Sequence, residues 1–325
     1  LASLGPMTPA AALMAKFPEQ AMRAFPLLKV MLALITGLSA VPCLAQEAAR
    51  TTALPVEWIT VDDGLPQGMV RTILQDRTGY LWFATKDGLA RTDGYGYTVF
   101  RHDARDSMSL CANHISALFE DRAGDLWIGT DAGAVDRYEP RTGAFVHVGR
   151  SDAITPGISQ AVRQFAEDGH GNVLVFATDG IVTRRTKDGT ANRVAEHIMA
   201  MAVAPNGALW TLRPDALEIT SRDDGSGAHV KRIALPTWPG VPALINDTLG
   251  KRMIMVRDRS VVFFDPVTQV TTDPIAVHAV GGELATYFLD GDKLWLGFVG
   301  DVLATRLSLT DGAEERIAFT EVNGG

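Results

Sequence analysis

The chain contains two close copies of one sequence motif, which we call the phrase. They are Asp76-Arg-Thr-Gly-Tyr-Leu-Trp82-Phe-Ala-Thr85 and Asp121-Arg-Ala-Gly-Asp-Leu-Trp127-Ile-Gly-Thr130. Shorter copies carry the same tryptophan at Trp210 and Trp295, and two more copies keep the interval with Leu174 and Met253 in its place. We call these six positions the slot. Successive slot residues are 45, 47, 36, 43 and 42 positions apart. A repeat of about 40 to 45 residues indicates a chain of small units that share one continuous core.

A second landmark keeps the same register. The segments Tyr138-Glu-Pro-Arg-Thr-Gly143 and Phe264-Asp-Pro-Val-Thr-Gln269 are close copies, and each begins eleven residues after its slot residue. Because two independent patterns share one phase, we interpret the repeat as structural.

Each unit has the pattern of four short strands. In the second unit, turns rich in Asp, Gly and Pro separate the apolar runs 115–119, 126–130, 134–138 and 145–148. Gly accepts a positive φ and the Asp side chain forms a hydrogen bond with its own backbone, so turns of this composition between short apolar runs are typical of β-hairpins. A single sheet of this size cannot bury its faces, and neighbouring units must therefore stack.

Four-stranded sheets that repeat radially form a β-propeller. We therefore predict an all-β propeller in residues 46–325, with six blades visible and a seventh incomplete. The blades are expected near residues 64–103, 110–149, 158–194, 197–233, 243–275 and 281–322. The slot residues are expected to fill the space between neighbouring sheets, where truncating a buried tryptophan to alanine typically costs about 3–5 kcal/mol. These residues are Trp82, Trp127, Leu174, Trp210, Met253 and Trp295.

The N-terminal region has the pattern of a secretory signal. A short basic segment, 22–29, precedes an apolar run of eleven residues, 30–40, and small residues follow as far as Ala45. Residues 22–45 are therefore predicted to be a signal peptide that directs the chain to the periplasm, and residues 1–21 to lie upstream of the true start at Met22. Spanning a bilayer takes about 20 apolar residues, and no stretch of the chain is that long, so no membrane span is predicted.

The remainder of the chain is acidic. Residues 1–45 carry three basic side chains and one acidic side chain, and without them the net charge changes from −8 to −10. Nucleic-acid binding needs clustered Lys and Arg, so we exclude nucleic acid as a partner. Only Cys111 remains after the signal peptide, so no internal disulfide is expected. No spacing of His, Cys or acidic residues predicts a metal, and no cofactor is expected.

The C-terminal residues have the pattern of a further unit. Asn323-Gly-Gly325 resembles Asp62-Asp-Gly64, which opens the first unit. The segment 56–61 precedes the first unit, and in closed propellers such a segment commonly completes the last blade and removes a raw sheet edge. We therefore expect a sequence that is truncated at the start of a seventh blade.

The first two units resemble a known repeat. Residues 63–94 and 113–133, which open with Asp63-Gly-Leu-Pro-Gln67 and Asn113-His-Ile-Ser-Ala117, are similar to the two-component regulator propeller repeat. The resemblance implies a periplasmic propeller that senses a small molecule or a glycan fragment for a histidine kinase or a diguanylate cyclase. It also implies that the membrane helix and the output domain are missing from this chain, and that any homodimer would form through those missing parts.

Ligand contacts are expected on one face of the ring. The loops that lead into the innermost strands and the loops that join second and third strands lie together around the channel, and ligand pockets usually occupy such mouths. The candidates are Gln67, Lys86, Asp87, Asn113, His114, Asp131, Asp179, Arg213 and Arg257, with Asp215, Asp258, Arg259 and Asp301 beside them. The alternative for any one of them is a turn residue with a solvated side chain.

Two other classes of function stay open. A propeller lyase or glycosidase needs a histidine with a general acid, or a pair of carboxylates, in an organised site. Of the seven histidines only His114 falls on a predicted mouth loop, so no catalytic residue is predicted. A protein-interaction scaffold needs only a complementary surface, and the fold does not choose among these classes.

Overall fold

The structure is a computed structural model that describes residues 50–56, 58–148, 160–186, 190–223, 227–235, 242–247, 251–257, 259–265, 268, 270–278, 282–301 and 303–321. The predicted upstream segment 1–21 and the predicted signal peptide 22–45 lie outside these residues. None of the described segments forms a helix with the length and apolar character that crossing a membrane requires.

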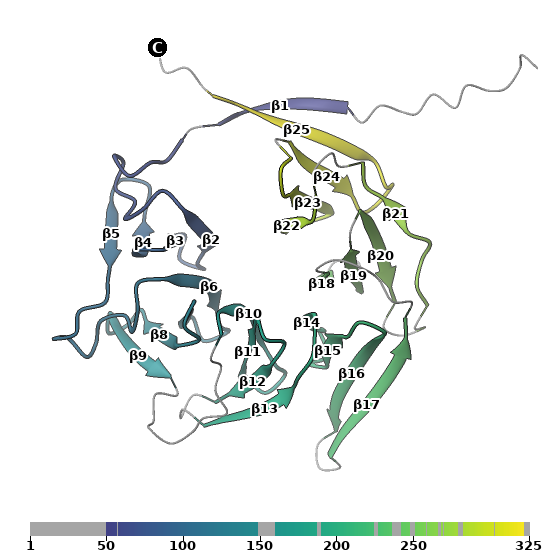
Figure 1. Cartoon of the computed structure of the whole chain (residues 1–325), viewed down its shortest axis with the longest axis horizontal. Coiled ribbons are helices and arrows are strands. Elements are labelled where there is room, and N and C mark those ends of the chain that lie inside the picture. Colours follow the sequence, from purple (N-terminus) through teal and green to yellow (C-terminus); the bar gives the residue numbers. More distant parts are fainter. Residues whose placement is uncertain are drawn as a thin grey trace, which may run out of the picture. The chain divides into compact units, whose positions relative to one another are not determined.

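The described strands form six antiparallel blades arranged in a propeller ring, as the repeat predicts (Figure 1). Blades one and two are β2 (Val70–Gln75), β3 (Leu81–Thr85), β4 (Gly88–Thr92), β5 (Tyr97–Phe100), and β6 (Ile115–Glu120), β7 (Leu126–Thr130), β8 (Val135–Glu139), β9 (Ala144–Val148). Blades three and four are β10 (Val162–Glu167), β11 (Val173–Ala177), β12 (Val182–Arg185), β13 (Ala191–Ala195), and β14 (Ala200–Val203), β15 (Leu209–Leu212), β16 (Ala216–Asp223), β17 (Gly227–Ala234). Blades five and six are β18 (Ala243–Asp247), β19 (Arg252–Arg257), β20 (Ser260–Phe264), β21 (Ile275–Ala276), and β22 (Leu284–Asp290), β23 (Lys293–Phe298), β24 (Ala304–Ser308), β25 (Glu314–Glu321).

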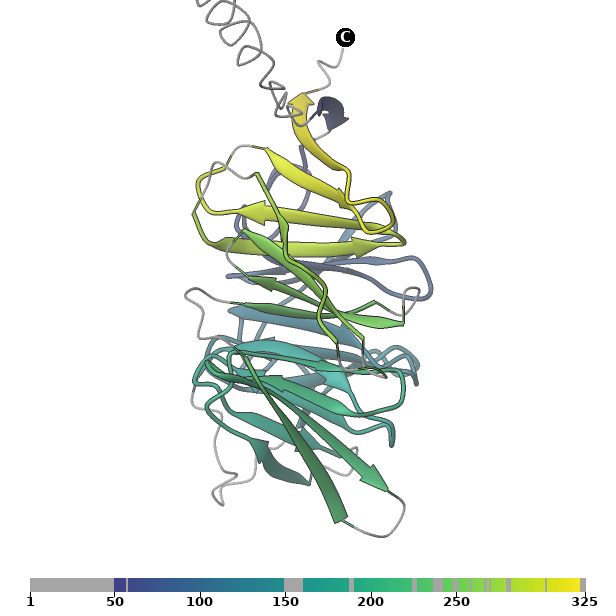
Figure 2. The ribbon, with the colours of Figure 1, turned by 90° about the vertical axis from the view of Figure 1, so that its right-hand side faces the viewer.

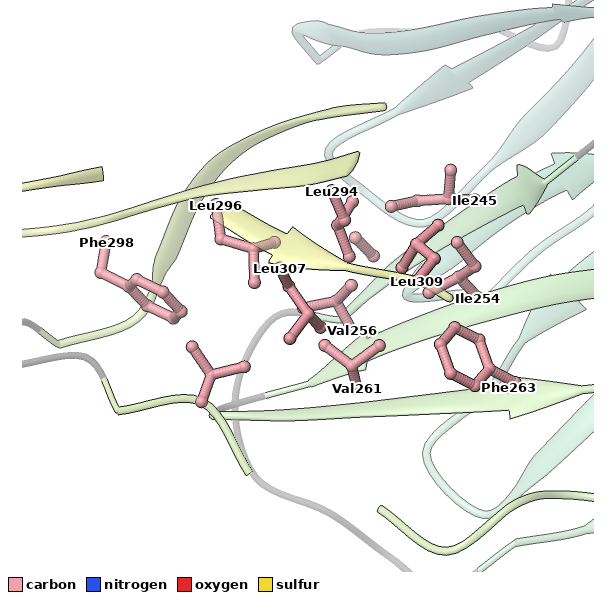
Figure 3. Close-up of a cluster of buried hydrophobic side chains, with 12 residues drawn as sticks. Ile245, Ile254, Val256, Val261, Phe263, Leu294, Leu296, Phe298, Leu307 and Leu309 are labelled. Atoms are coloured by element: carbon pink, nitrogen blue, oxygen red, sulfur yellow. The ribbon is translucent and has the colours of Figure 1, made fainter. Parts of the chain in front are cut away.

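The first strand of each blade lies nearest to the centre of the ring, and the fourth strand lies outside (Figure 1). Seen from the side, successive sheets pack face to face (Figure 2). The buried apolar residues are therefore located between blades rather than in one central core. Five hydrophobic clusters join blades one to two, two to three, three to four, four to five and five to six. Figure 3 shows the last of these, in which Ile254 and Phe263 of blade five meet Leu294 and Leu307 of blade six.

Four slot residues lie in these clusters and face the next blade along the chain. They are Trp82, Trp127, Leu174 and Trp210, and each is at most 2% exposed. The indole Nε1 of Trp82 donates to Asp76 Oδ2 at 2.8 Å, and that of Trp127 donates to Asp121 Oδ2 at 3.0 Å. The aspartate that opens each phrase thus orients the tryptophan and also accepts backbone N–H groups of its own turn.

The structure shifts the slot of blade five by one residue. Met253 is buried, but it packs toward blade four beside Trp210, whereas Ile254 faces blade six. The reason is the length of the first hairpin. Asp76 pairs through its backbone with Tyr80, four positions on, while Asp247 pairs with Arg252, five positions on. One extra residue in the turn moves the position of β19 that faces the next blade from 253 to 254, because side chains alternate between the two faces along a strand.

Blades six and one meet differently from the other pairs. Within the described residues, no hydrophobic cluster joins them, and the sixth cluster (Leu65, Phe83 and Ala90) belongs to blade one alone. The slot residue Trp295 is only partly buried, and Phe288, its partner on β22, is 65% exposed. This side of the ring therefore lacks the apolar packing that the other five junctions share.

The strand before blade one does not lie where the sequence predicts it. Residues 58–60 have no regular structure, and the strand is instead β1 (Arg50–Val56). It runs parallel to β25 and forms the outer edge of blade six, so it covers the raw edge of the last sheet (Figure 1). A seventh blade stays a prediction.

Candidate functional site

The ring encloses a cavity of about 350 Å³ at its centre. Residues from the first strands of all six blades contribute to its wall. They include Arg71, Thr72, Ser116, Ala117, Arg163, Gln164, Phe165, Ala200, Leu244, Thr286 and Tyr287. The volume lies within the range of small-molecule sites, and the wall mixes apolar surface with a few polar groups, as such sites do.

The charge of this wall is opposite to that of the chain. The protein has a net charge of −8, yet Arg71 and Arg163 are the charged side chains among the described lining residues, and none of those residues is Asp or Glu. A focused positive potential in a concave, low-dielectric wall attracts anions. The cavity is therefore suited to a negatively charged ligand.

Arg163 is held in place from two sides. Its Nη1 donates to the carbonyl oxygen of Met199 at 3.1 Å, and its guanidinium lies 5.5 Å from the ring centroid of Phe176. The side chain is exposed to the cavity, while the surrounding walls desolvate it enough to lower its pKa, an effect that the nearby Tyr287 phenol opposes. A guanidinium carries five N–H donors, so this geometry fixes its direction without using up its donors.

Tyr287 lies near Arg163. Desolvation by the cavity walls raises the pKa of the Tyr287 phenol, and the positive charge of Arg163 acts in the opposite direction. The phenol therefore stays neutral at ordinary pH and can both donate and accept a hydrogen bond. Together, Arg163 and Tyr287 offer a charged fork and a neutral hydroxyl to one ligand.

One of the predicted loop residues, Asp131, contacts a residue of the cavity wall, and it connects in turn to the loop that carries Asn113 and His114. Asp131 approaches Arg71 with an Oδ1–Nη2 distance of 3.4 Å, and its N–H bonds the carbonyl of His114. His114 is exposed, whereas Asn113 is committed to the fold, since its Oδ1 accepts the His102 N–H at 2.7 Å. The mouth loop is thus connected to the cavity through the pair formed by Asp131 and Arg71.

Most of the other predicted residues serve turns or ion pairs. Gln67 Oε1 accepts the N–H of Met69, Asp179 Oδ1 accepts that of Ile181, and Asp87 pairs with Arg101 at 3.1 Å. Lys86 is half-buried in the β3–β4 turn.

The remaining candidates lie on blades four to six or outside the described residues. Arg213 Nε lies 2.7 Å from Glu218 Oε2, and Asp215 Oδ2 lies 2.8 Å from Arg232 Nη2, so both residues are in ion pairs. Asp301 binds the guanidinium of Arg316 through both carboxylate oxygens, at 2.8 and 2.7 Å. Burial lowers the pKa of Arg257 to about 10, and the Arg259 carbonyl accepts the Val277 N–H. Asp258 lies outside the described part of the chain. None of the described residues among these candidates lines the central cavity, and the role of all of them as ligand contacts stays a prediction.

The other end of the strands shows a repeated contact between hairpins. The Arg77 N–H donates to Glu120 at 3.0 Å, and one blade later the Arg122 N–H donates to Glu167 at 2.8 Å. Arg77 also pairs with Glu120 through Nε at 2.7 Å. A second cavity, of about 440 Å³, is lined there by these same hairpins. Because its charged groups already join neighbouring blades, we regard this end as structural.

The sequence-based search missed Arg71, Arg163 and Tyr287. All three belong to innermost strands rather than to loops. A signal was present, because a long charged residue inside a short first strand is unusual for a sheet packed on both faces. Arg71 and Arg163 are such residues, flanked on both sides by partly or fully buried neighbours.

Comparison with known proteins supports the sequence resemblance. Residues 64–87 and 109–132 match the sequence profile of the two component regulator propeller, and they contain the first hairpins of blades one and two. A stretch of 48 residues is 44% identical to Histidine kinase P4 of Formosa agariphila. That stretch is 15% of this chain and 4% of the kinase, so the likeness concerns the repeat and not the enzyme as a whole.

Solved structures share the fold. The chain is similar to the extracellular domain of the hybrid two component system BT3049 from B. thetaiotaomicron, with a TM-score of 0.64 and 20% identity over 82% of this chain and 37% of that one. It is also similar to virginiamycin B lyase from Staphylococcus aureus, with a TM-score of 0.61 and 14% identity over 78% of this chain and 84% of the lyase. At such identities the likeness shows a propeller and does not decide between a sensor and an enzyme. The chain spans little more than a third of the BT3049 domain.

Proposed function

We propose that this chain is the extracytoplasmic sensor region of a bacterial receptor, because residues 64–87 and 109–132 match the two component regulator propeller. In this proposal the chain is exported, binds a ligand in the central cavity, and passes the signal to a membrane and output part such as a histidine kinase or a diguanylate cyclase. Dimerisation through that part belongs to the same proposal. The chain itself is proposed to be non-catalytic.

The observation that carries the proposal is the arginine-lined cavity of an acidic propeller. Arg163 lines this cavity and is anchored by the Met199 carbonyl, no described lining residue is Asp or Glu, and Tyr287 adds a neutral hydroxyl. Planar guanidinium groups bind carboxylates bidentately, with two parallel hydrogen bonds. We infer that the ligand is a small acidic molecule, with a uronate-containing oligosaccharide as the class that combines carboxylates with many hydroxyls.

Ligand binding by itself does not make a sensor. A ligand signals only when its binding free energy differs between two states of the element to which the site is coupled. The cavity wall draws one strand from every blade, so a ligand that contacts several first strands at once would stabilise one mutual arrangement of the blades. Among the described residues, no hydrophobic cluster joins blades six and one, so the mutual position of these two blades is the one that apolar packing stabilises least.

Isothermal titration calorimetry tests the binding step. The probe is oligogalacturonate, and its fully methyl-esterified form is the matched neutral control. We expect the acidic form to bind and the ester to bind at least tenfold more weakly. Arg163→Gln keeps the side chain long and polar but removes the charge, and the loss of a charged hydrogen bond worth about 1.5–3 kcal/mol predicts an affinity roughly 10- to 100-fold lower.

Arg193→Gln is the matched control variant. Arg193 is an exposed arginine of β13, the outermost strand of the same blade, where it pairs with Glu196 at 2.9 Å. It should leave the affinity unchanged. Binding that is the same in Arg163→Gln and in the parent protein would count against the cavity as the site. A titrated oligosaccharide that is recovered cleaved would assign an enzyme instead, as the likeness to a lyase fold leaves open.

A further inference from the structure

One pair of repeat positions has a different chemistry in blade two. In blade one, Ala90 on β4 pairs with Val99 on β5, and both are apolar. The equivalent pair on β8 and β9 is Asp136 and His147. Asp136 is fully buried on the face that blade two turns toward blade one. An ionised carboxylate in such a place costs free energy unless it is paired or coordinates a metal, so this exception to the repeat requires a reason.

A third group approaches the same place from the preceding loop. The N–H of Cys111 donates to Asp136 Oδ2 at 2.8 Å, and His147 Nδ1 lies 2.6 Å from Asp136 Oδ1. The neighbouring Leu110 is completely buried between blades one and two and anchors the loop. As a result, the Cys111 sulfur, a carboxylate oxygen of Asp136 and an imidazole nitrogen of His147 lie within 4.8 Å of one another.

These three groups are the ligand types that zinc prefers. Zn²⁺ binds thiolate sulfur at about 2.3 Å and imidazole nitrogen or carboxylate oxygen at about 2.0–2.2 Å, and sites with three protein ligands keep a fourth position open. Because the three atoms lie within 4.8 Å of one another, small movements of their side chains would let all three reach one ion. His147 is 22% exposed in its side chain and Cys111 is partly exposed, so solvent and an ion can reach the cluster.

We propose that Cys111, Asp136 and His147 form a site for a divalent transition metal ion, with Zn²⁺ as the best match to the donor set. On binding, the thiol proton of Cys111 is released to solvent. The proton on His147 Nδ1 moves to Nε2, which leaves the Nδ1 lone pair to the metal. The ion neutralises the buried carboxylate and ties the loop before β6 to the outer strands of blade two. This site is separate from the central cavity and does not depend on the proposed sensor function.

Cobalt substitution gives the most specific test. Co²⁺ added to the full chain should produce the near-ultraviolet charge-transfer absorption of a cobalt thiolate, saturating at one ion per chain, and Zn²⁺ should displace it. Cys111→Ser should abolish that absorption, while Cys43→Ser, the matched control made in the chain that keeps residues 22–45, should leave it unchanged. His147→Gln and Asp136→Asn should weaken Zn²⁺ binding in calorimetry at least tenfold, whereas the exposed His170→Gln should bind as the parent protein does.

Circular dichroism of each variant keeps the test decisive, because a variant that retains its β-sheet spectrum has lost the site and not the fold. The proposal is overturned if the parent protein shows no thiolate absorption with Co²⁺. It is equally overturned if a folded Cys111→Ser or His147→Gln variant binds Zn²⁺ as tightly as the parent protein.

Discussion

Replacing Trp127 by alanine probes the packing between blades two and three. The side chain is fully buried among Val162, Phe165 and Val175, and its indole N–H donates to Asp121 at 3.0 Å. Truncation of a buried tryptophan costs about 3–5 kcal/mol. The hydrogen bond to a carboxylate oxygen adds roughly 1–2 kcal/mol, since Asp121 keeps its backbone bonds but loses this donor. We therefore expect a loss of about 4–7 kcal/mol, a large part of the stability of a typical domain.

Urea denaturation, followed by circular dichroism because the substitution removes a fluorophore, measures this loss. The matched control is Trp295→Ala, which changes the same repeat position in blade six. Trp295 is only partly buried, lies outside the clusters that join described blades, and has the Arg306 guanidinium 5.2 Å from its ring. Its truncation should cost only about 1 kcal/mol. Equal losses for the two variants would refute the argument that neighbouring blades, and not the repeat phrase itself, give the tryptophan its energetic weight.

Two other predictions concern the aspartate that opens the phrase. In blade four Ala204 takes its place in the same turn, and Trp210 Nε1 has no hydrogen-bond partner within the described residues; Ala204→Asp should supply one and raise the urea midpoint by the equivalent of about 1 kcal/mol. In blade one, burial alone would raise the pKa of Asp76, but hydrogen bonds from Thr78, Trp82 and Tyr80 outweigh it and hold the pKa below its usual value. A depressed pKa contributes stability that is complete above the unfolded value near 3.9 and is lost as the pH falls through the folded value. The stability difference between the parent protein and Asp76→Asn, measured by urea denaturation at pH 7, 4 and 3, should therefore shrink below about pH 4. A difference that stays constant with pH would contradict hydrogen bonding as the cause of the lowered pKa. An unchanged urea midpoint for Ala204→Asp would contradict the role of the turn aspartate in bonding the tryptophan.

The fold could be predicted because its determinants are local and repeated. The turn aspartate and the slot tryptophan lie six positions apart, so one hairpin contains both, and the interval between copies reveals the stacking. The same reasoning failed by one residue in blade five. Nothing in the sequence around Met253 distinguishes a turn with one extra residue, because Met253 and Ile254 are both apolar and both become buried.

The site was less predictable than the fold. Loop residues such as Asp131 could be assigned to one face from topology alone, and Asp131 does approach Arg71. Arg71 and Arg163 were missed because ligand contacts were expected only on the loops at the channel mouth, whereas both residues lie on first strands that form the wall of the cavity. The cluster of Cys111, Asp136 and His147 was missed for a different reason. Its members are 25 and 11 positions apart, and only the pairing of β8 with β9 and the loop before β6 bring them together.

Hydrogen–deuterium exchange of the chain with and without oligogalacturonate reports where an acidic ligand binds, and it therefore tests whether the central cavity is the ligand site. We expect slower exchange in the first strands β2, β10 and β22, which carry Arg71, Arg163 and Tyr287, and unchanged exchange in the outer strand β13. Slower exchange confined to outer strands, or no difference at a concentration that saturates binding, would contradict the assignment of the central cavity as the ligand site.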